Sequence, residues 1–364
     1  MRSVASAYLA AQRYAICICT LSTLAFGQWI PVESSETDAS LRGVHNAGSG
    51  IIWASGTGGT VLRSEDDGFV WQKCRMPDET RNLDFRGIWA WDANHAIVMS
   101  SGPGDSSRLY ETVDGGATWR LLFRNPDLTG FWDGIAFSGK EGMLVGDPVN
   151  GRFAVFHTKD LGQHWTRDDN PALNADPKRE GIFAASNSSL PVRQPGANFV
   201  FATGGLSGSR LFLLNHFMFI SGSNKYETQT WSSSVLTLAV GAESSGAFST
   251  DFRTLEIGVA VGGDYKRPTT TDGTAAFTSD GGVHWRKSTK PPSGFRSAVQ
   301  WAADFQCWIA VGTNGSDVSF DDGNTWQQFD RGNWNALSVP WVVGPKGQIA
   351  RLDEQALKGL AASR

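Results

Sequence analysis

Seven polar side chains occupy the same place in a four-residue phrase that recurs along the chain. The polar residue typically follows an aromatic or leucine and precedes a small and an aliphatic residue, as in residues 41–44 (LRGV) and 85–88 (FRGI). In chain order the polar positions are Arg42, Arg86, Asp133, Glu180, Ser245, Arg296 and Asn335. If the phrases are structurally equivalent, these side chains form one ring of mixed charge.

The chemistry of such a ring depends on how its charges are used. Guanidinium groups bind carboxylates and phosphates through paired hydrogen bonds, so the arginines could hold an anionic ligand. Asp133 and Glu180, from consecutive phrases, could instead supply the carboxylate pair of a glycosidase. A third interpretation is structural, because partly buried charges commonly neutralise one another.

Two loops carry a second group of candidate residues. Asp147 and Arg152 belong to residues 146–152 (GDPVNGR), and Asp264 and Tyr265 follow a pair of glycines. Loops on a rigid scaffold often supply ligand contacts. An aspartate that accepts hydrogen bonds from its own turn explains both motifs equally well.

An octet of the form Ser/Thr-x-Asp-x-Gly-x-x-Trp, the Asp box, recurs five times, at residues 64–71, 112–119, 158–165, 278–285 and 319–326. Its aspartate can accept hydrogen bonds from the backbone of its own turn, its glycine permits a positive φ, and its tryptophan returns to pack on the sheet. We therefore interpret these aspartates as structural rather than catalytic or metal-binding: Asp66, Asp114, Asp160, Asp280 and Asp321.

The spacing of the boxes sets the fold class. The first three begin 48 and 46 residues apart and the last two 41 apart, a period that fits four-stranded antiparallel propeller blades. Blade starts fall near residues 41, 85, 131, 179, 244, 295 and 333. We predict an all-β, seven-bladed β-propeller as one domain over residues 28–364, with the polar ring at the mouth of its central channel.

Two blades depart from the repeat. Blade four lacks an Asp box, and the 65 residues from Glu180 to Ser245 indicate an insertion. Blade seven ends without an outer strand, which residues 28–32 (QWIPV) could supply from the N-terminal end. That pairing would close the ring and remove two exposed sheet edges.

Residues 1–27 are typical of a targeting segment. Arg2 and Arg13 are followed by the apolar run 14–26, and small residues precede a cleavage site after Gly27. We expect a signal peptide and a secreted or periplasmic protein, with an uncleaved anchor as the alternative. Two of the four cysteines lie in this segment, and the other two are Cys74 and Cys307. These two fall in blades that are not neighbours, so we expect both to be unpaired.

Several function classes have no support in the sequence. The net charge is −4 and no basic track is present, which argues against a nucleic-acid partner. The six histidines are scattered without metal-ligand spacing, and no phosphate-binding or dinucleotide motif occurs, so no metal and no cofactor are expected. No second apolar run is long enough for a membrane span, and a monomer is expected.

The Asp boxes resemble those of the BNR, sortilin and sialidase group of propellers. Longer phrases resemble the photosystem II stability/assembly factor-like family, namely residues 131–135 (FWDGI), 146–153 (GDPVNGRF), 183–187 (FAASN), 261–265 (VGGDY) and 295–299 (FRSAV). This resemblance covers most of the chain outside blade four. It implies an exported seven-bladed propeller that binds or scaffolds other proteins.

We therefore expect a non-catalytic scaffold that engages a protein or peptide partner at the charged channel mouth, with a glycan as a second candidate ligand. The alternative is a carbohydrate-active propeller, glycosidase or sialidase-like, that uses Asp133 and Glu180. The Arg-Ile-Pro signature of sialidases is absent, which favours the scaffold.

Overall fold

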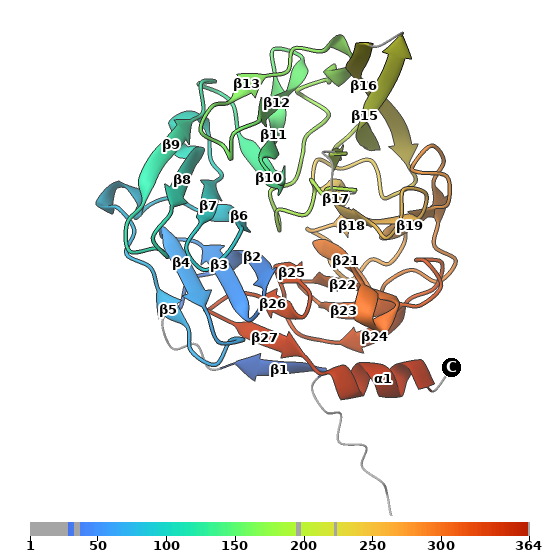
Figure 1. Cartoon of the computed structure of the whole chain (residues 1–364). Coiled ribbons are helices and arrows are strands. Elements are labelled where there is room, and N and C mark those ends of the chain that lie inside the picture. The colour runs from blue at the N-terminus through green and yellow to red at the C-terminus, as the bar shows by residue number, and fades with distance from the viewer. Residues whose placement is uncertain (1–27, 33–36, 194–197, 222–223, 363–364) are drawn as a thin grey trace, which may run out of the picture.

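Seven small β-sheets stand around a common axis in the computed structural model, which describes residues 28–32, 37–193, 198–221 and 224–362. Figure 1 shows the sheets arranged as the blades of a propeller, with the chain running once around the ring. The prediction of a seven-bladed β-propeller is confirmed. The expected signal peptide, residues 1–27, lies outside the described residues.

Five blades are complete antiparallel sheets of consecutive strands, each beginning at the channel and ending at the rim. Blade one contains β2 (Leu41–Gly48), β3 (Ile51–Gly56), β4 (Thr60–Ser64) and β5 (Gln72–Lys73). Blade two contains β6 (Phe85–Ala90), β7 (Ala96–Ser100), β8 (Arg108–Thr112) and β9 (Arg120–Arg124). Blade three contains β10 (Trp132–Ser138), β11 (Glu141–Val149), β12 (Arg152–Thr158) and β13 (Thr166–Arg167). Blade five contains β17 (Ser245–Phe252), β18 (Gly258–Asp264), β19 (Ala275–Thr278) and β20 (Arg286–Lys287). Blade six contains β21 (Ala298–Ala302), β22 (Cys307–Gly312), β23 (Gly315–Ser319) and β24 (Gln327–Asp330).

The Asp boxes turn the chain from the third strand of a blade to the fourth. In each box the aspartate Oδ1 accepts the backbone N–H four residues later, at 2.8–3.0 Å. The preceding Ser or Thr hydroxyl donates to the same carboxylate, as from Thr158 to Asp160 at 2.8 Å. These contacts confirm the structural role predicted for Asp66, Asp114, Asp160, Asp280 and Asp321.

The ring closes through strands from opposite ends of the chain. Blade seven is formed by β25 (Ala336–Ser338), β26 (Trp341–Val343) and β27 (Ile349–Leu352), and β1 (Trp29–Val32) is its outermost strand. β1 pairs antiparallel with β27 over four residues, which confirms the predicted closure. Helix α1 (Glu354–Ala362) follows and buries Leu357 against blade six and β1.

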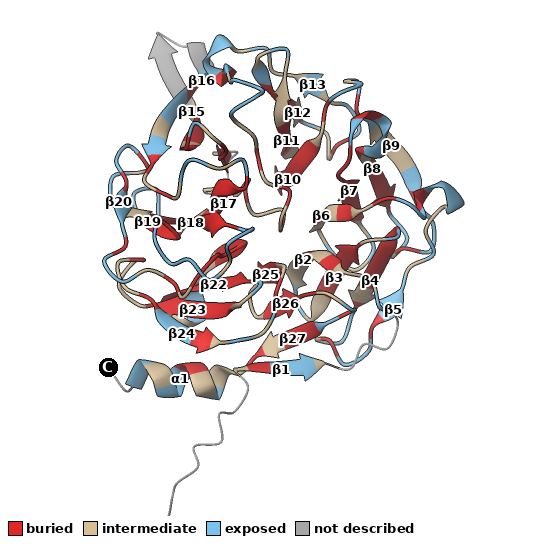
Figure 2. Cartoon of the chain, turned by 180° about the vertical axis from the view of Figure 1, so that it is seen from behind, coloured by how far each residue is buried: buried red, intermediate tan, exposed pale blue. Residues whose placement is uncertain are grey.

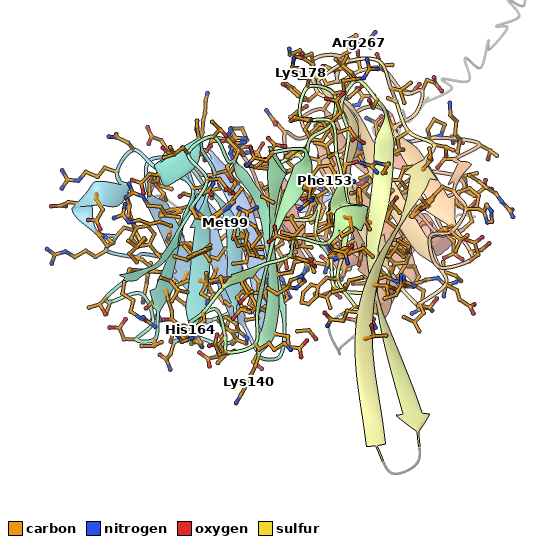
Figure 3. All side chains as sticks on the ribbon, turned by 90° about the horizontal axis from the view of Figure 1, so that it is seen from above. Met99, Lys140, Phe153, His164, Lys178 and Arg267 are labelled. Atoms are coloured by element: carbon orange, nitrogen blue, oxygen red, sulfur yellow. The ribbon has the colours of Figure 1, made fainter. Side chains whose placement is uncertain are left out.

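Blade four has three regular strands, β14 (Val200–Ala202), β15 (Ser209–Ser221) and β16 (Asn224–Leu236). Its predicted start near residue 179 forms no strand, and only an isolated bridge joins Gly181 to Gly204. β15 and β16 are each 13 residues long, whereas the next longest strand, β11, has nine residues. Figure 3 shows this hairpin extending beyond one face of the disc. The insertion inferred from the sequence is therefore this hairpin together with the irregular inner segment.

The core lies between neighbouring blades, where buried side chains from two adjacent sheets form joint hydrophobic clusters. Figure 2 shows the buried residues concentrated along the strands of the blades. Box tryptophans contribute to the core, with Trp71, Trp119, Trp285 and Trp326 all buried. Cys74 and Cys307 are both free thiols, as predicted. Among the described residues, no helix is long and apolar enough to cross a membrane.

Candidate functional site

A cavity of about 1000 Å³ opens at one mouth of the central channel. Every blade contributes to its wall, from Arg42 of blade one to Asn335 of blade seven. Figure 3 places Lys178, which lines the cavity, on one face of the disc and Lys140 and His164 on the other. The β15–β16 hairpin extends beyond that second face, so the two features lie on opposite sides.

A β-bulge in the innermost strand aims each of the first three ring residues. The pairing register of β2, β6 and β10 skips one residue, and the skipped residues are Arg42, Arg86 and Asp133. A bulge bends the strand and re-aims the side chain of the extra residue. All three line the cavity, as does Asn335. The alignment of blade starts therefore correctly placed these four side chains around one space.

Blade five uses a different residue from the one predicted. In β17 the register skips Phe248, between Ala247 and Ser249, so Phe248 is the counterpart of Arg42. Ser245 pairs with Asp264 at the end of the strand, its hydroxyl donates to the Ala242 carbonyl at 2.9 Å, and it does not line the cavity. The prediction was three residues out of register, because this blade has Ala247 where most of the other phrases have an aromatic or leucine and Phe248 where they have a polar residue.

Blade six is out of register by one residue. Ala298 pairs with Val311 just as Gly43 pairs with Ser55, which makes Ser297 the counterpart of Arg42. Arg296 is fully buried and does not line the cavity. Its Nε donates to Asp317 at 2.7 Å, so its predicted place in the ring is wrong and its role is structural.

Glu180 and the second group of candidates divide between the cavity and its surroundings. Glu180 lines the cavity from an irregular segment rather than from an inner strand. Asp147 lines it from a bulge near the end of β11, and Tyr265 lines it from the loop after β18. Asp264 is buried and accepts a hydrogen bond from Arg267 at 2.8 Å, so it holds its own turn. Arg152 is exposed and contacts a smaller pocket beside Asp168.

The floor of the cavity is a segment that crosses the channel where the inner strand of blade four would run. Asn187 exchanges two hydrogen bonds with the Ile135 backbone of blade three, at 2.8 and 2.9 Å. One residue earlier, the Ser186 hydroxyl donates to the Ser297 carbonyl of blade six at 2.8 Å. Residues 183–187 thus tie opposite sides of the ring together and include cavity-lining residues. We call residues 183–187 the plug.

One wall of the cavity is charged and incompletely paired. Arg86 donates to Asp84 at 2.8 Å and to the Ala184 carbonyl of the plug at 3.2 Å. The buried Nε of Arg42 has no hydrogen-bond partner among the described residues. The Asp133 carboxylate accepts no side-chain hydrogen bond there, although the backbone N–H groups of Asp147 and Ala184 are close enough to lower its pKa. Burial, and then Arg86, lower the pKa of Arg42. Burial, and then Asp147, raise the pKa of Asp133 well above its usual range. Unsatisfied buried polar groups are costly, and a ligand that pairs with them would relieve that cost.

The opposite wall is aromatic and was not predicted as a unit. Phe183 of the plug stacks on Phe248 with ring centroids 3.8 Å apart and planes within 5°. Phe295 meets Phe248 edge-on at 4.7 Å, and Tyr265 meets it edge-on at 6.1 Å. All four rings line the cavity. Phe248 could have been found by aligning the small residue after each polar position, since Ser249 takes the place of Gly43.

Asp147 gives this site a predicted pH signature. Burial raises its pKa from an ordinary value near 3.8 to about 6, although Oδ1 accepts the Ile182 N–H at 2.9 Å. Because the pKa of Asp147 is raised in the folded state, its contribution to the free energy of unfolding is most favourable when the carboxyl is protonated. That contribution falls as the pH rises from about 4 through 6. Asp147→Asn keeps the acceptor and removes the charge. We expect it to raise the free energy of unfolding by about 1–3 kcal/mol at pH 8.

Urea unfolding of both proteins between pH 4 and pH 8 measures this difference. The advantage of Asp147→Asn should shrink towards zero as the pH falls to 4, because the native carboxyl is then largely protonated. Asp147→Ala is the control that also removes the acceptor for Ile182. A constant advantage at every pH, or a loss at pH 8, would contradict the assigned burial of this carboxyl.

Within the described ranges, no group of three or more His, Cys, Asp or Glu side chains is placed to hold a metal ion.

Comparison with known proteins supports the resemblance noted in the sequence. The family model described as photosynthesis system II assembly factor YCF48 matches residues 70–185. No curated protein matches the chain. The resemblance is thus confirmed over blades two and three and their flanks.

Solved structures extend the likeness to the whole ring. "YCF48 bound to D1 peptide" is 17% identical with a TM-score of 0.60, covering 90% of this chain and 97% of that one. YCF48 from Cyanidioschyzon merolae is 16% identical with a TM-score of 0.57, covering 90% and 99%. At these identities the likeness establishes a shared fold. The GH74 xyloglucanase from Xanthomonas campestris aligns with a TM-score of only 0.34, too low to bear on fold or activity.

Proposed function

We propose that this propeller, similar to the photosystem II assembly factors, is an exported, non-catalytic scaffold that binds a peptide segment of a partner protein at its channel mouth. One observation carries the proposal: a cavity of about 1000 Å³, with the plug as its floor, sets incompletely hydrogen-bonded arginine and aspartate side chains on one wall against four aromatic rings on the other. Export rests on the targeting pattern of residues 1–27.

The two walls define the chemistry of the peptide. Arg42 and Arg86 suit a carboxylate, because a guanidinium presents paired donors to its two oxygens. The aromatic wall, centred on Phe248, suits an apolar or aromatic side chain. A carboxylate beside an apolar side chain is the chemistry of a peptide C-terminus, or of an acidic residue next to an apolar one. That one similar propeller is described as bound to a D1 peptide agrees with a peptide ligand.

The carbohydrate-active alternative has less support. Glu180, its second carboxylate, has both oxygens hydrogen-bonded to Arg210, at 2.8 and 3.0 Å. Its Oε2 also accepts the Asp176 N–H at 3.0 Å. A carboxylate with both oxygens engaged by a guanidinium is poorly placed to contact a glycosidic oxygen.

A calorimetric titration tests the proposal with a defined probe, acetyl-Ala-Ala-Ala-Phe bearing a free carboxylate. Arg42→Gln and Arg86→Gln each remove one charge-assisted contact, worth about 1.5–3 kcal/mol, so we expect binding at least about tenfold weaker in each variant. Arg286→Gln is the matched control, because Arg286 is exposed on β20 at the rim.

Unchanged affinity in both cavity variants would overturn the proposed site. Weak binding of the peptide together with tight binding of an oligosaccharide would favour the carbohydrate-active alternative. Circular dichroism of each variant establishes that the propeller is intact before its affinity is interpreted.

A further inference from the structure

Six of the seven blades end at the rim in a short strand that is protected from further pairing. These outer strands, β1, β5, β9, β13, β20 and β24, are between two and five residues long. Each carries a charged residue or, in β1, Pro31. Short length, charge and proline are the features by which proteins keep sheet edges from pairing with other chains.

Blade four lacks this protection. The strand missing from its sheet is the inner one, so β16 is its outermost strand, and β16 is 13 residues long. Residues 228–236 (TQTWSSSVL) contain no charge and no proline. Ser232 and Ser233 are exposed, and Val235 is 72% exposed. β16 is longer than any of the other six outer strands, and its charged residues, Lys225 and Glu227, lie near its first end, which leaves residues 228–236 as an uncharged edge.

The backbone register shows which groups the edge presents. Leu214 of β15 donates its N–H to Phe199, on the side of β14, so its register partner Trp231 is not hydrogen-bonded to it. Hydrogen-bonded and non-bonded pairs alternate along an antiparallel ladder. The N–H and C=O groups of Trp231, Ser233 and Val235 therefore point outward, and none has a backbone hydrogen bond to another described residue.

The fold already accepts a strand from a distant part of the chain at the rim of a blade. Blade seven is completed by β1, which lies more than 300 residues away along the chain from β27. A strand supplied by a second polypeptide would extend blade four beyond β16 through the same antiparallel geometry. The hairpin extends beyond the disc, on the face opposite the cavity, which gives a bulky partner access to the edge (Figure 3).

We propose that the outer edge of β16 is a self-association surface, at which β16 of one copy pairs antiparallel with β16 of a second. The absence of charge over residues 228–236 favours this occupant, because a two-fold pairing sets each residue against the same segment and like charges would oppose one another. The rim strands β9, with Arg120 and Arg124, and β20, with Arg286 and Lys287, would meet that repulsion. The assignment replaces the monomer expected from the sequence and is independent of the cavity.

Sedimentation equilibrium of the purified protein, over about 1–100 µM, is the test. We expect a monomer–dimer equilibrium in the native protein. Ser233→Pro removes an outward N–H that the ladder with β15 does not use, so the blade should remain folded. We expect its dimer dissociation constant to rise at least about tenfold, with Ser233→Ala as the matched control that keeps the N–H.

A second variant and a second readout separate a broken edge from a damaged fold. Val235→Lys adds the charge that the other edges carry and should weaken the dimer in the same way. Amide hydrogen exchange should show residues 230–236 more protected at high concentration in the native protein and not in Ser233→Pro. A native protein that stays monomeric throughout, or a Ser233→Pro variant that dimerises like the native one, overturns the proposal. Neither result changes the peptide titration at the cavity.

Discussion

Replacing Arg296 with alanine is expected to lower the free energy of unfolding by about 3–5 kcal/mol, because it leaves a buried carboxylate without its partner. Arg296 is fully buried, and the side chain of Asp317 is 2% exposed. The guanidinium also donates to Asn314 and to the Phe295 carbonyl, both at 2.6 Å. Removing the guanidinium would leave hydrogen-bond acceptors on several segments of blade six without a donor.

Chemical denaturation of Arg296→Ala measures the loss. The double variant Arg296→Met/Asp317→Leu is the control, because replacing both charges with apolar groups of similar volume should restore much of the stability. At a temperature where the single variant remains folded, its peptide affinity should match the native value. A stability change below about 1 kcal/mol would show that Arg296 is not the buried structural cation described here.

Trp29→Ala is expected to lower the free energy of unfolding by about 3–5 kcal/mol, although Trp29 lies on a strand of only four residues at the rim of blade seven. Trp29 is 3% exposed and packs against Phe329 and Trp334, with ring centroids 6.1 and 6.2 Å away. Its Nε1 donates to Ser316 of blade six at 3.0 Å. The side chain thus joins the last two blades where the ring closes.

Thermal and urea unfolding would give the size of this effect, and hydrogen exchange would locate it. Trp29→Phe is the matched control, since it keeps an aromatic ring and loses only the hydrogen bond, about 1 kcal/mol. The amides of β26 and β27 should lose protection in Trp29→Ala before those of blades two and three. Equal stability of Trp29→Ala and the native protein would mean that β1 contributes nothing to closure.

The fold could be predicted because its signals are local and repeated. Each Asp box contains its own turn chemistry, as in the contact of Asp114 with the N–H of Thr118, so five copies fix the period without knowledge of distant contacts. Closure by residues 28–32 followed from the missing strand of blade seven. The β15–β16 hairpin could not be foreseen in detail, because blade four has no box to anchor its register.

The site was predicted where a bulge and its phrase coincide, at Arg42, Arg86 and Asp133. It was missed where pairing across the blade sets the register. Ser297 rather than Arg296 faces the cavity because Ala298 pairs with Val311, a contact that spacing alone does not reveal. The plug was hidden for a related reason, since its hydrogen bonds reach blades three and six rather than its neighbours in sequence.

A crystal structure of the protein with acetyl-Ala-Ala-Ala-Phe bound tests the central claim most directly. We expect the peptide at the channel mouth, with its carboxylate between the guanidinium groups of Arg42 and Arg86 and its phenyl ring against Phe248. A peptide bound on the rim, on the face where the hairpin extends, or with its carboxylate away from both arginines would contradict it.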